Sequence, residues 1–132
     1  MGFAFSTATS NATIPMSIDT LDKKMGVSKQ ISSFTIPLGA TINMDGTAIM
    51  QTIAAIFVAS CGGYEVTMSS LLVIAALALV ASVGTPSAPG AGAVILFTIL
   101  SGMGYVNEGA LMAYSLILAI NRPIEMLVTS LN

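Results

Sequence analysis

Two long runs without a charged residue constrain the fold of this sequence more than any other feature. No Asp, Glu, Lys or Arg lies between Gly46 and Tyr64 or between Val66 and Asn107. Only 8% of the residues are charged, whereas soluble domains carry about 25%. These side chains are too few to cover a soluble domain, so the pattern predicts an integral membrane protein in contact with lipid. No basic patch indicates a nucleic-acid partner.

The rarest residue types exclude several kinds of chemistry. The chain has no His and one Cys, Cys61, which leaves no disulfide framework and no His/Cys metal site. A nucleophilic serine would need Lys, Asp or Glu as its base, and none is close in sequence to Ser6 or Ser10. We therefore predict no enzyme activity and no organic cofactor.

The two ends of the sequence predict a fragment. The opening MGFAFSTATSNATIP lacks the basic region of a signal peptide. The last residue, Asn132, follows an apolar stretch without a helix-ending signal. We expect residues 1–132 to be one piece of a longer protein.

A helix is predicted over residues 9–24, after a Ser/Thr-rich start. Residues 6–11 are the first of three candidate helix breaks. A polar stretch follows at 19–30 and holds all the lysines of the chain, Lys23, Lys24 and Lys29. Because positive residues mark cytoplasmic loops, the loop 22–30 is predicted to face the cytoplasm.

Residues 31–60 have the length of one membrane-spanning helix, about 20 residues or more, but a polar segment interrupts them. This segment is 42–46, INMDG, with Pro37 shortly before it. A helix breaks at membrane depth only where the freed backbone faces protein or a watery cavity. We therefore predict a broken transmembrane helix that emerges outside near residues 61–65.

Residues 67–103 are predicted to form a re-entrant hairpin of two short apolar helices. The segment between them, 83–92, holds three glycines and two prolines, which break a helix. Both arms are uncharged, and the second is short for a membrane span. The alternative is a pair of ordinary spans joined by a loop. Taken together, the sequence predicts an all-α membrane fold with broken helices and re-entrant hairpins.

The last helix, 107–132, is predicted to carry one polar face. It begins with Asn107 and Glu108, which suit a helix N-terminus. Spacings of three and four residues place four polar side chains on or near one face: Arg122, Glu125, Thr129 and Asn132. Ionisable residues at membrane depth usually face a bundle interior or a substrate path.

The polar segment at 42–46 has the donor set of a site for a hard cation. Asp45 lies near Thr41, Asn43 and Thr47, and no nitrogen or sulfur ligand is close. One carboxylate matches a sodium ion or a proton better than a divalent ion. The alternative is a structural role, in which Asp45 caps the helix that starts near Thr47. Broken helices recur as ion and substrate sites in secondary transporters.

Arg122 and Glu125 are three residues apart and have two interpretations. They could form a mutual salt bridge that lowers the cost of burying both. Alternatively, Glu125 holds a substrate ammonium while Arg122 holds a carboxylate or tunes Glu125. Pro123 between them loosens the helix locally.

These motifs together resemble the dicarboxylate/amino acid:cation symporter family, which has the glutamate-transporter-like fold. The stretch TIPLGATINMDGTAI resembles its seventh helix with the NMDGT signature, and SVGTPSAPGAGA resembles the tip of its second re-entrant hairpin. FSTATSNATIP is similar to the tip and second arm of the first hairpin, and the last helix to the eighth helix.

The resemblance covers the whole sequence and implies the C-terminal part of a mobile transport domain. Residues 1–24 would be the tip and second arm of hairpin 1, and 31–60 the broken helix. Residues 67–103 would be hairpin 2, and 107–132 the truncated last helix. The full-length protein is then expected to be a homotrimer.

The resemblance also implies three sodium sites. Gly39, Asn43 and Asn132 would contribute to one, and Asn43 and Asp45 to another. The third would lie beneath the hairpin tip and use Thr41 with backbone carbonyls of Ser82, Val83 and Thr85.

The implied substrate contacts come from every segment. They are Thr9, Ser10, Asn11, Thr47, the backbone of Val83, Gly84 and Thr85, and Arg122, Glu125, Thr129 and Asn132. The sequence departs from the family where members that take acidic substrates have Arg, here Val128, and where some have Arg in the first hairpin, here Ala8. Glu125 replaces the usual Asp, and one sodium-binding Asp would lie beyond Asn132.

The sequence therefore predicts a secondary active transporter. The leading hypothesis is Na⁺-coupled symport of an amino acid or dicarboxylate across the plasma (cell inner) membrane, with H⁺ as an alternative coupling ion. The competing hypothesis is a structural or channel-like helical bundle without coupled transport.

Overall fold

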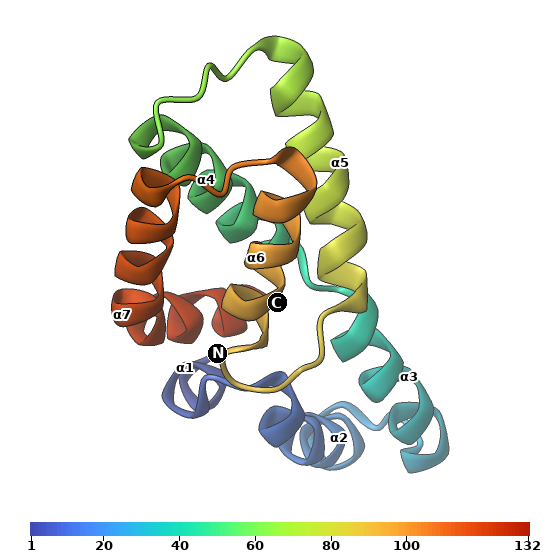
Figure 1. Ribbon diagram of the computed structural model, residues 1–132. Coiled ribbons are helices and arrows are strands. Elements are labelled where there is room, and N and C mark those ends of the chain that lie inside the picture. The colour runs from blue at the N-terminus through green and yellow to red at the C-terminus, as the bar shows by residue number, and fades with distance from the viewer.

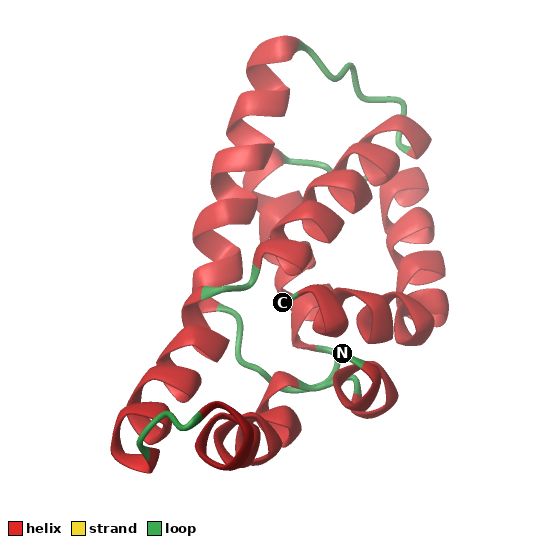
Figure 2. Ribbon diagram, turned by 180° about the vertical axis from the view of Figure 1, so that it is seen from behind, coloured by secondary structure: helices red, strands yellow, loops and turns green.

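A computed structural model describes residues 1–132 as seven α-helices and no strands (Figures 1 and 2). The prediction of an all-helical fold is therefore confirmed. In chain order the helices are α1 (Gly2–Thr7), α2 (Ser10–Met25), α3 (Lys29–Ile42), α4 (Asp45–Cys61), α5 (Met68–Gly84), α6 (Ala91–Met103) and α7 (Glu108–Leu131).

Polar caps and glycines set most of the helix ends. The side chains of Ser28, Thr67 and Asn107 each accept a hydrogen bond from the first turn of α3, α5 and α7. After α2 and α6 the chain turns through Gly26 and Gly104, whose φ angles are 69° and 76°. Glycine adopts this left-handed conformation without a steric penalty. These local signals explain why the observed ends lie close to the predicted ones.

The interruption of the broken helix is shorter than predicted. Helix α3 continues through Ile42 and α4 begins at Asp45, so the break comprises Asn43 and Met44 instead of residues 42–46. The residue before α4 is Met44, and no side chain caps this helix. Asp45 therefore does not cap α4, so the capping role that was the alternative to an ion site is wrong.

The break in the α5–α6 hairpin is also shorter than predicted. Helix α5 runs through Val83 and Gly84, and α6 begins at Ala91, so the loop spans 85–90 instead of 83–92. A glycine is tolerated at the end of a helix, whereas Thr85 is extended with ψ of 123°. Pro86 follows it, and a proline disfavours helical backbone in the residue before it.

Helix α7 holds Pro123 inside its length and changes direction between its two ends in both views (Figures 1 and 2). A proline removes one backbone hydrogen bond and is a recognised cause of such kinks. The kink turns the last part of α7 beneath the α5–α6 hairpin and toward α1 (Figure 1). The chain ends near its own beginning, since Met1 and Asn132 line one cavity.

The core lies among α4, α5, α6 and α7. Its fully buried members include Val58, Ile74, Leu96 and Leu100, and alanines on all four helices fill the rest. Small residues let helix backbones approach closely in membrane proteins, where dispersion contacts replace the hydrophobic effect as the main packing force.

Two segments are long and apolar enough to cross a membrane. They are Lys29–Cys61, which comprises α3 and α4, and Glu108–Leu131, each with a mean hydropathy of 1.4. Large apolar side chains such as Leu72 and Val80 are exposed on the outer faces.

At the polar end of α2, Asp19 forms a 2.7 Å ion pair with Lys23. The hydrogen bond that Lys23 donates to Asp19 raises the pKa of Lys23.

A glycine substitution tests the close approach of α7 to α4. A Cβ on Gly109 would lie 2.9 Å from the backbone oxygen of Cys61, so Gly109→Ala must push the helices apart. Overpacking of this kind costs about 1–3 kcal/mol. We expect a lower melting temperature for the full-length protein in detergent. Gly102→Ala is the matched control, because its Cβ would meet nothing closer than 3.9 Å, and an equal melting temperature for both variants would contradict this packing.

Candidate functional site

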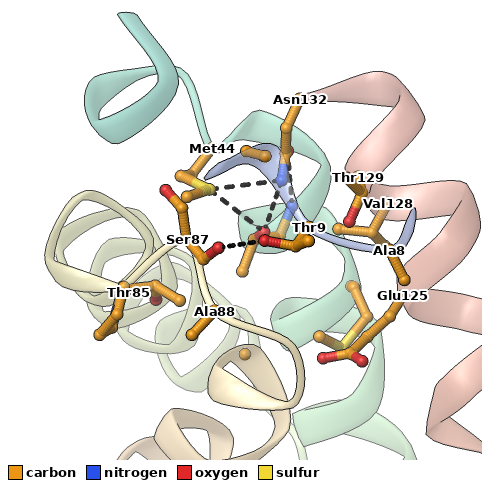
Figure 3. Close-up of a pocket in the computed structure, with 15 residues that line it drawn as sticks. Ala8, Thr9, Met44, Thr85, Ser87, Ala88, Glu125, Val128, Thr129 and Asn132 are labelled. Carbon is orange, nitrogen blue, oxygen red and sulfur yellow. Dashed lines mark hydrogen bonds between the residues drawn. The ribbon is translucent and has the colours of Figure 1, made fainter. Parts of the chain in front are cut away.

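The interruptions of the helices meet at one small cavity (Figure 3). Its walls come from the α1–α2 turn, the α3–α4 break with the start of α4, the α5–α6 loop with the start of α6, and the last turns of α7. The cavity has a volume of about 40 Å³, which is room for a few water molecules at about 10–15 Å³ each. Its lining comprises Ala8, Thr9, Ser10, Met44, Thr47, Met50, Thr85, Pro86, Ser87, Ala88, Gly92, Glu125, Val128, Thr129 and Asn132.

Most of the residues predicted to contact a substrate line this cavity. They are Thr9, Ser10, Thr47, Thr85, Glu125, Thr129 and Asn132. Four others do not line it. Asn11 is exposed in the first turn of α2, Val83 and Gly84 are exposed at the end of α5, and the side chain of Arg122 is 64% exposed.

The sequence predictions missed several lining residues. Met44 and Met50 flank Thr47 by three residues on either side, a helical spacing that could have identified them. Ser87, Ala88 and Gly92 belong to the predicted Gly/Pro segment, but no pattern distinguishes the loop residues that turn inward from those that turn outward.

Asn132 ties the α3–α4 break to the end of α7. Its side-chain amide donates to Thr47 Oγ1 at 2.9 Å and to the Met44 sulfur at 3.4 Å. Its side-chain oxygen accepts from the Thr47 backbone N–H at 3.3 Å, and its backbone oxygen accepts from Asn43 Nδ2 at 3.3 Å. Gly46 permits this approach, since a Cβ there would lie 2.9 Å from the Asn132 side-chain oxygen.

A second cavity borders the same break and is lined by the end of α3. Gly39, Asn43 and Asn132, the residues predicted for one sodium site, all line it. Hydroxyl groups form much of the remaining wall, from Ser10, Thr13, Ser17, Thr35, Thr129 and Ser130. Oxygen donors of this kind suit a hard cation.

The residues predicted for the third sodium site are not joined by any hydrogen bond. The Thr41 hydroxyl donates to the Pro37 carbonyl of its own helix at 3.1 Å. Ser82 and Thr85 are buried near the end of α5, where their hydroxyls also bond to backbone carbonyls of the preceding turn. Helix α3 contacts α5, so both groups belong to neighbouring helices.

Asp45 lines neither cavity. It is exposed in the first turn of α4, and its carboxylate has neither a hydrogen-bond partner nor an ion pair among residues 1–132. The positive end of the helix dipole favours a carboxylate at this position.

Glu125 is the one charged residue in the lining of the first cavity. It is buried, and the Arg122 guanidinium lies 3.4 Å from its Oε2. Its Oε1 accepts a hydrogen bond from the backbone N–H of Gly90 in the α5–α6 loop. The geometry thus contains the salt bridge foreseen for this pair, with Arg122 outside the cavity and the carboxylate inside it.

Comparison with known proteins identifies the family. The model of the sodium:dicarboxylate symporter family matches residues 1–132. The chain belongs to this family. Its members are transporters, which confirms the family resemblance and the prediction that the chain is not an enzyme.

Individual members of the symporter family are similar to almost the whole chain. An excitatory amino acid transporter of Caenorhabditis elegans is 36% identical over 129 residues, 98% of this chain and 25% of that protein. Human excitatory amino acid transporters 2 and 1 are 36% and 35% identical over the same length, which is 22% and 23% of those proteins. The chain spans about a quarter of the length of these relatives.

A substitution at Asn132 tests its role in fixing the α3–α4 break. Asn132→Leu keeps the side-chain size but removes the bonds to Thr47 and Met44, which should cost about 1–3 kcal/mol of stability. We expect a lower melting temperature for the full-length protein in detergent. Ser115→Ala on the same helix is the control, since its hydroxyl bonds only to Leu111 of its own turn. A control that melts as early as the Asn132 variant would contradict this role.

Proposed function

We propose that these residues form the ion- and substrate-binding part of a Na⁺-coupled symporter of amino acids or dicarboxylates. The observation that carries the proposal is the cavity where two hairpin tips, a broken helix and the polar face of α7 meet. Polar backbone freed at membrane depth is tolerated where it lines such a cavity. Membership of the sodium:dicarboxylate symporter family supports the same function.

The coupling ion would bind at the α3–α4 break. Gly39, Asn43 and Asn132 offer oxygen atoms to the second cavity, and the C-terminal end of α3 adds the negative end of a helix dipole. Asp45 would serve a separate ion and would complete its site with groups outside residues 1–132. The family description favours sodium as the ion, with a proton as the alternative.

The charge of the first cavity favours a neutral amino acid as substrate. Glu125 can pair with a substrate ammonium, whereas no cationic side chain lines the cavity to pair with a second carboxylate. Val128 and the two methionines Met44 and Met50 supply apolar surface beside it. Arg122 reaches Glu125 from outside the cavity.

The membrane arrangement follows from the same features. We propose that the α1–α2 and α5–α6 pairs enter the membrane as re-entrant hairpins, and that the lysine-rich loop 22–30 faces the cytoplasm. The full-length protein would lie in the plasma (cell inner) membrane as a homotrimer, with residues 1–132 in the moving transport domain.

Sodium dependence separates this proposal from a structural or channel-like bundle. In liposomes with full-length protein, uptake of a neutral amino acid should require a sodium gradient. Loss of even an outer-shell partner costs roughly 10- to 100-fold in metal affinity, so Asp45→Ala should raise the sodium concentration for half-maximal uptake at least that much. Glu65→Ala, an exposed carboxylate in the α4–α5 loop, is the control. Uptake at an unchanged rate with neither a sodium nor a proton gradient would refute coupled transport.

Competition between substrates tests the charge argument. Neutral amino acids should inhibit uptake at lower concentrations than glutamate, because the cavity has no partner for a second carboxylate. Val128→Arg places a cation in the lining and should shift the preference toward glutamate, whereas Val94→Arg on the exposed face of α6 should not. Glutamate as the tightest competitor of the unmodified protein would refute the assignment and make Arg122→Ala the next variant to measure.

A further inference from the structure

Three separate elements hold the α5–α6 loop against the first cavity. The Thr9 hydroxyl in the α1–α2 turn donates to the Ser87 carbonyl at 2.6 Å. The Gly90 N–H donates to Glu125 of α7, and the Ser87 hydroxyl donates to the Ala40 carbonyl of α3 at 3.4 Å. Figure 3 shows the first of these contacts, between Thr9 and Ser87.

The bond from Thr9 is shorter than the bond from Ser87 to Ala40, and the backbone around Thr9 is shaped for it. Thr9 is the residue before α2, a position where threonine usually caps its own helix. Its side chain makes no such cap and bonds to the opposite hairpin instead. Ala8 beside it has a φ of 51°, a left-handed conformation that is uncommon outside glycine. The turn therefore has an uncommon backbone conformation and lacks a side-chain cap, while the Thr9 side chain bonds to Ser87.

This arrangement leaves little room for a substrate. A threonine hydroxyl has one proton, and Thr9 gives it to Ser87, so the same group cannot also donate to a substrate carboxylate. The cavity volume of about 40 Å³ holds a few water molecules and no amino acid. The α5–α6 loop must therefore leave Thr9 before an amino acid can enter.

We propose that Thr9 is a gating residue whose hydroxyl clasps the α5–α6 loop shut over the first cavity. Opening breaks the Thr9–Ser87 bond and frees the loop from Glu125. A substrate ammonium is a stronger hydrogen-bond donor to Glu125 than the Gly90 N–H, so substrate would take the place of the loop at that carboxylate. The part of this inference that concerns substrate entry rests on the function proposed above, whereas the clasp itself does not.

Accessibility of the loop measures the clasp without transport. In full-length protein with its cysteines replaced, including Cys61→Ser, Thr85→Cys places a thiol at a buried position of the loop. Its rate of reaction with a membrane-impermeant maleimide, in the absence of substrate, reports how often the loop is open. Thr9→Val keeps the shape and removes the hydroxyl, and should raise this rate about fivefold, the effect expected from one ordinary hydrogen bond.

Two further variants make the result decisive. Thr9→Ser retains a hydroxyl and should react at the rate of the unmodified turn. Thr20→Val removes a hydroxyl that bonds only within α2 and should leave the rate unchanged. Equal rates for Thr9→Val and the parent, or an equally fast Thr9→Ser, would overturn the clasp. Melting temperatures in detergent identify any variant that reacts faster because it is misfolded.

Uptake measured on the same proteins separates this inference from the proposed function. Faster labelling of Thr9→Val in a protein that shows no sodium-dependent uptake would support the clasp and refute the function. Sodium-dependent uptake with unchanged labelling would refute the clasp and leave the function standing.

Discussion

The backbone of the α3–α4 break needs polar partners inside an otherwise apolar chain, and the rest of the site follows from how that need is met. Two residues leave the helix, Asn43 and Met44, and no water is present in a membrane core to satisfy the freed groups. Asn132, at the far end of the sequence, accepts a hydrogen bond from the Thr47 backbone N–H. It also bonds to the side chains of Asn43, Met44 and Thr47. The end of α7 is thereby fixed against the start of α4.

The position of α7 then determines which groups share the cavity. Because α7 bends and ends against the break, the Glu125 side chain points toward the α5–α6 loop (Figure 3). The loop is drawn to the same place by Thr9 and Ala40. The segments that would bind an ion, bind a substrate and act as the gate therefore all meet at one cavity. Because they share this cavity, binding at one segment can affect the other segments.

Several features of the fold could be predicted because their causes are local. Asn107 starts α7 where a cap is expected, and Pro86 ends α5 through its effect on Thr85. The exact length of each break was less predictable. Ile42, Val83 and Gly84 remain helical because hydrogen bonds of the preceding turns extend as far as the chain allows, and no residue among them forbids it. In the site, helical spacing indicated Glu125, Thr129 and Asn132, but it could not exclude Arg122, whose long side chain turns outward.

By itself, the sequence determined the membrane class, the helices, the places where they break and the polar face of α7, because charge distribution, proline, glycine and helical periodicity act within a few residues. Only the tertiary structure decided which polar groups meet. The bonds of Thr9 to Ser87, Glu125 to Gly90 and Asn132 to Thr47 join residues 78, 35 and 85 positions apart. Contacts over such separations depend on how helices pack and bend, which no local pattern encodes.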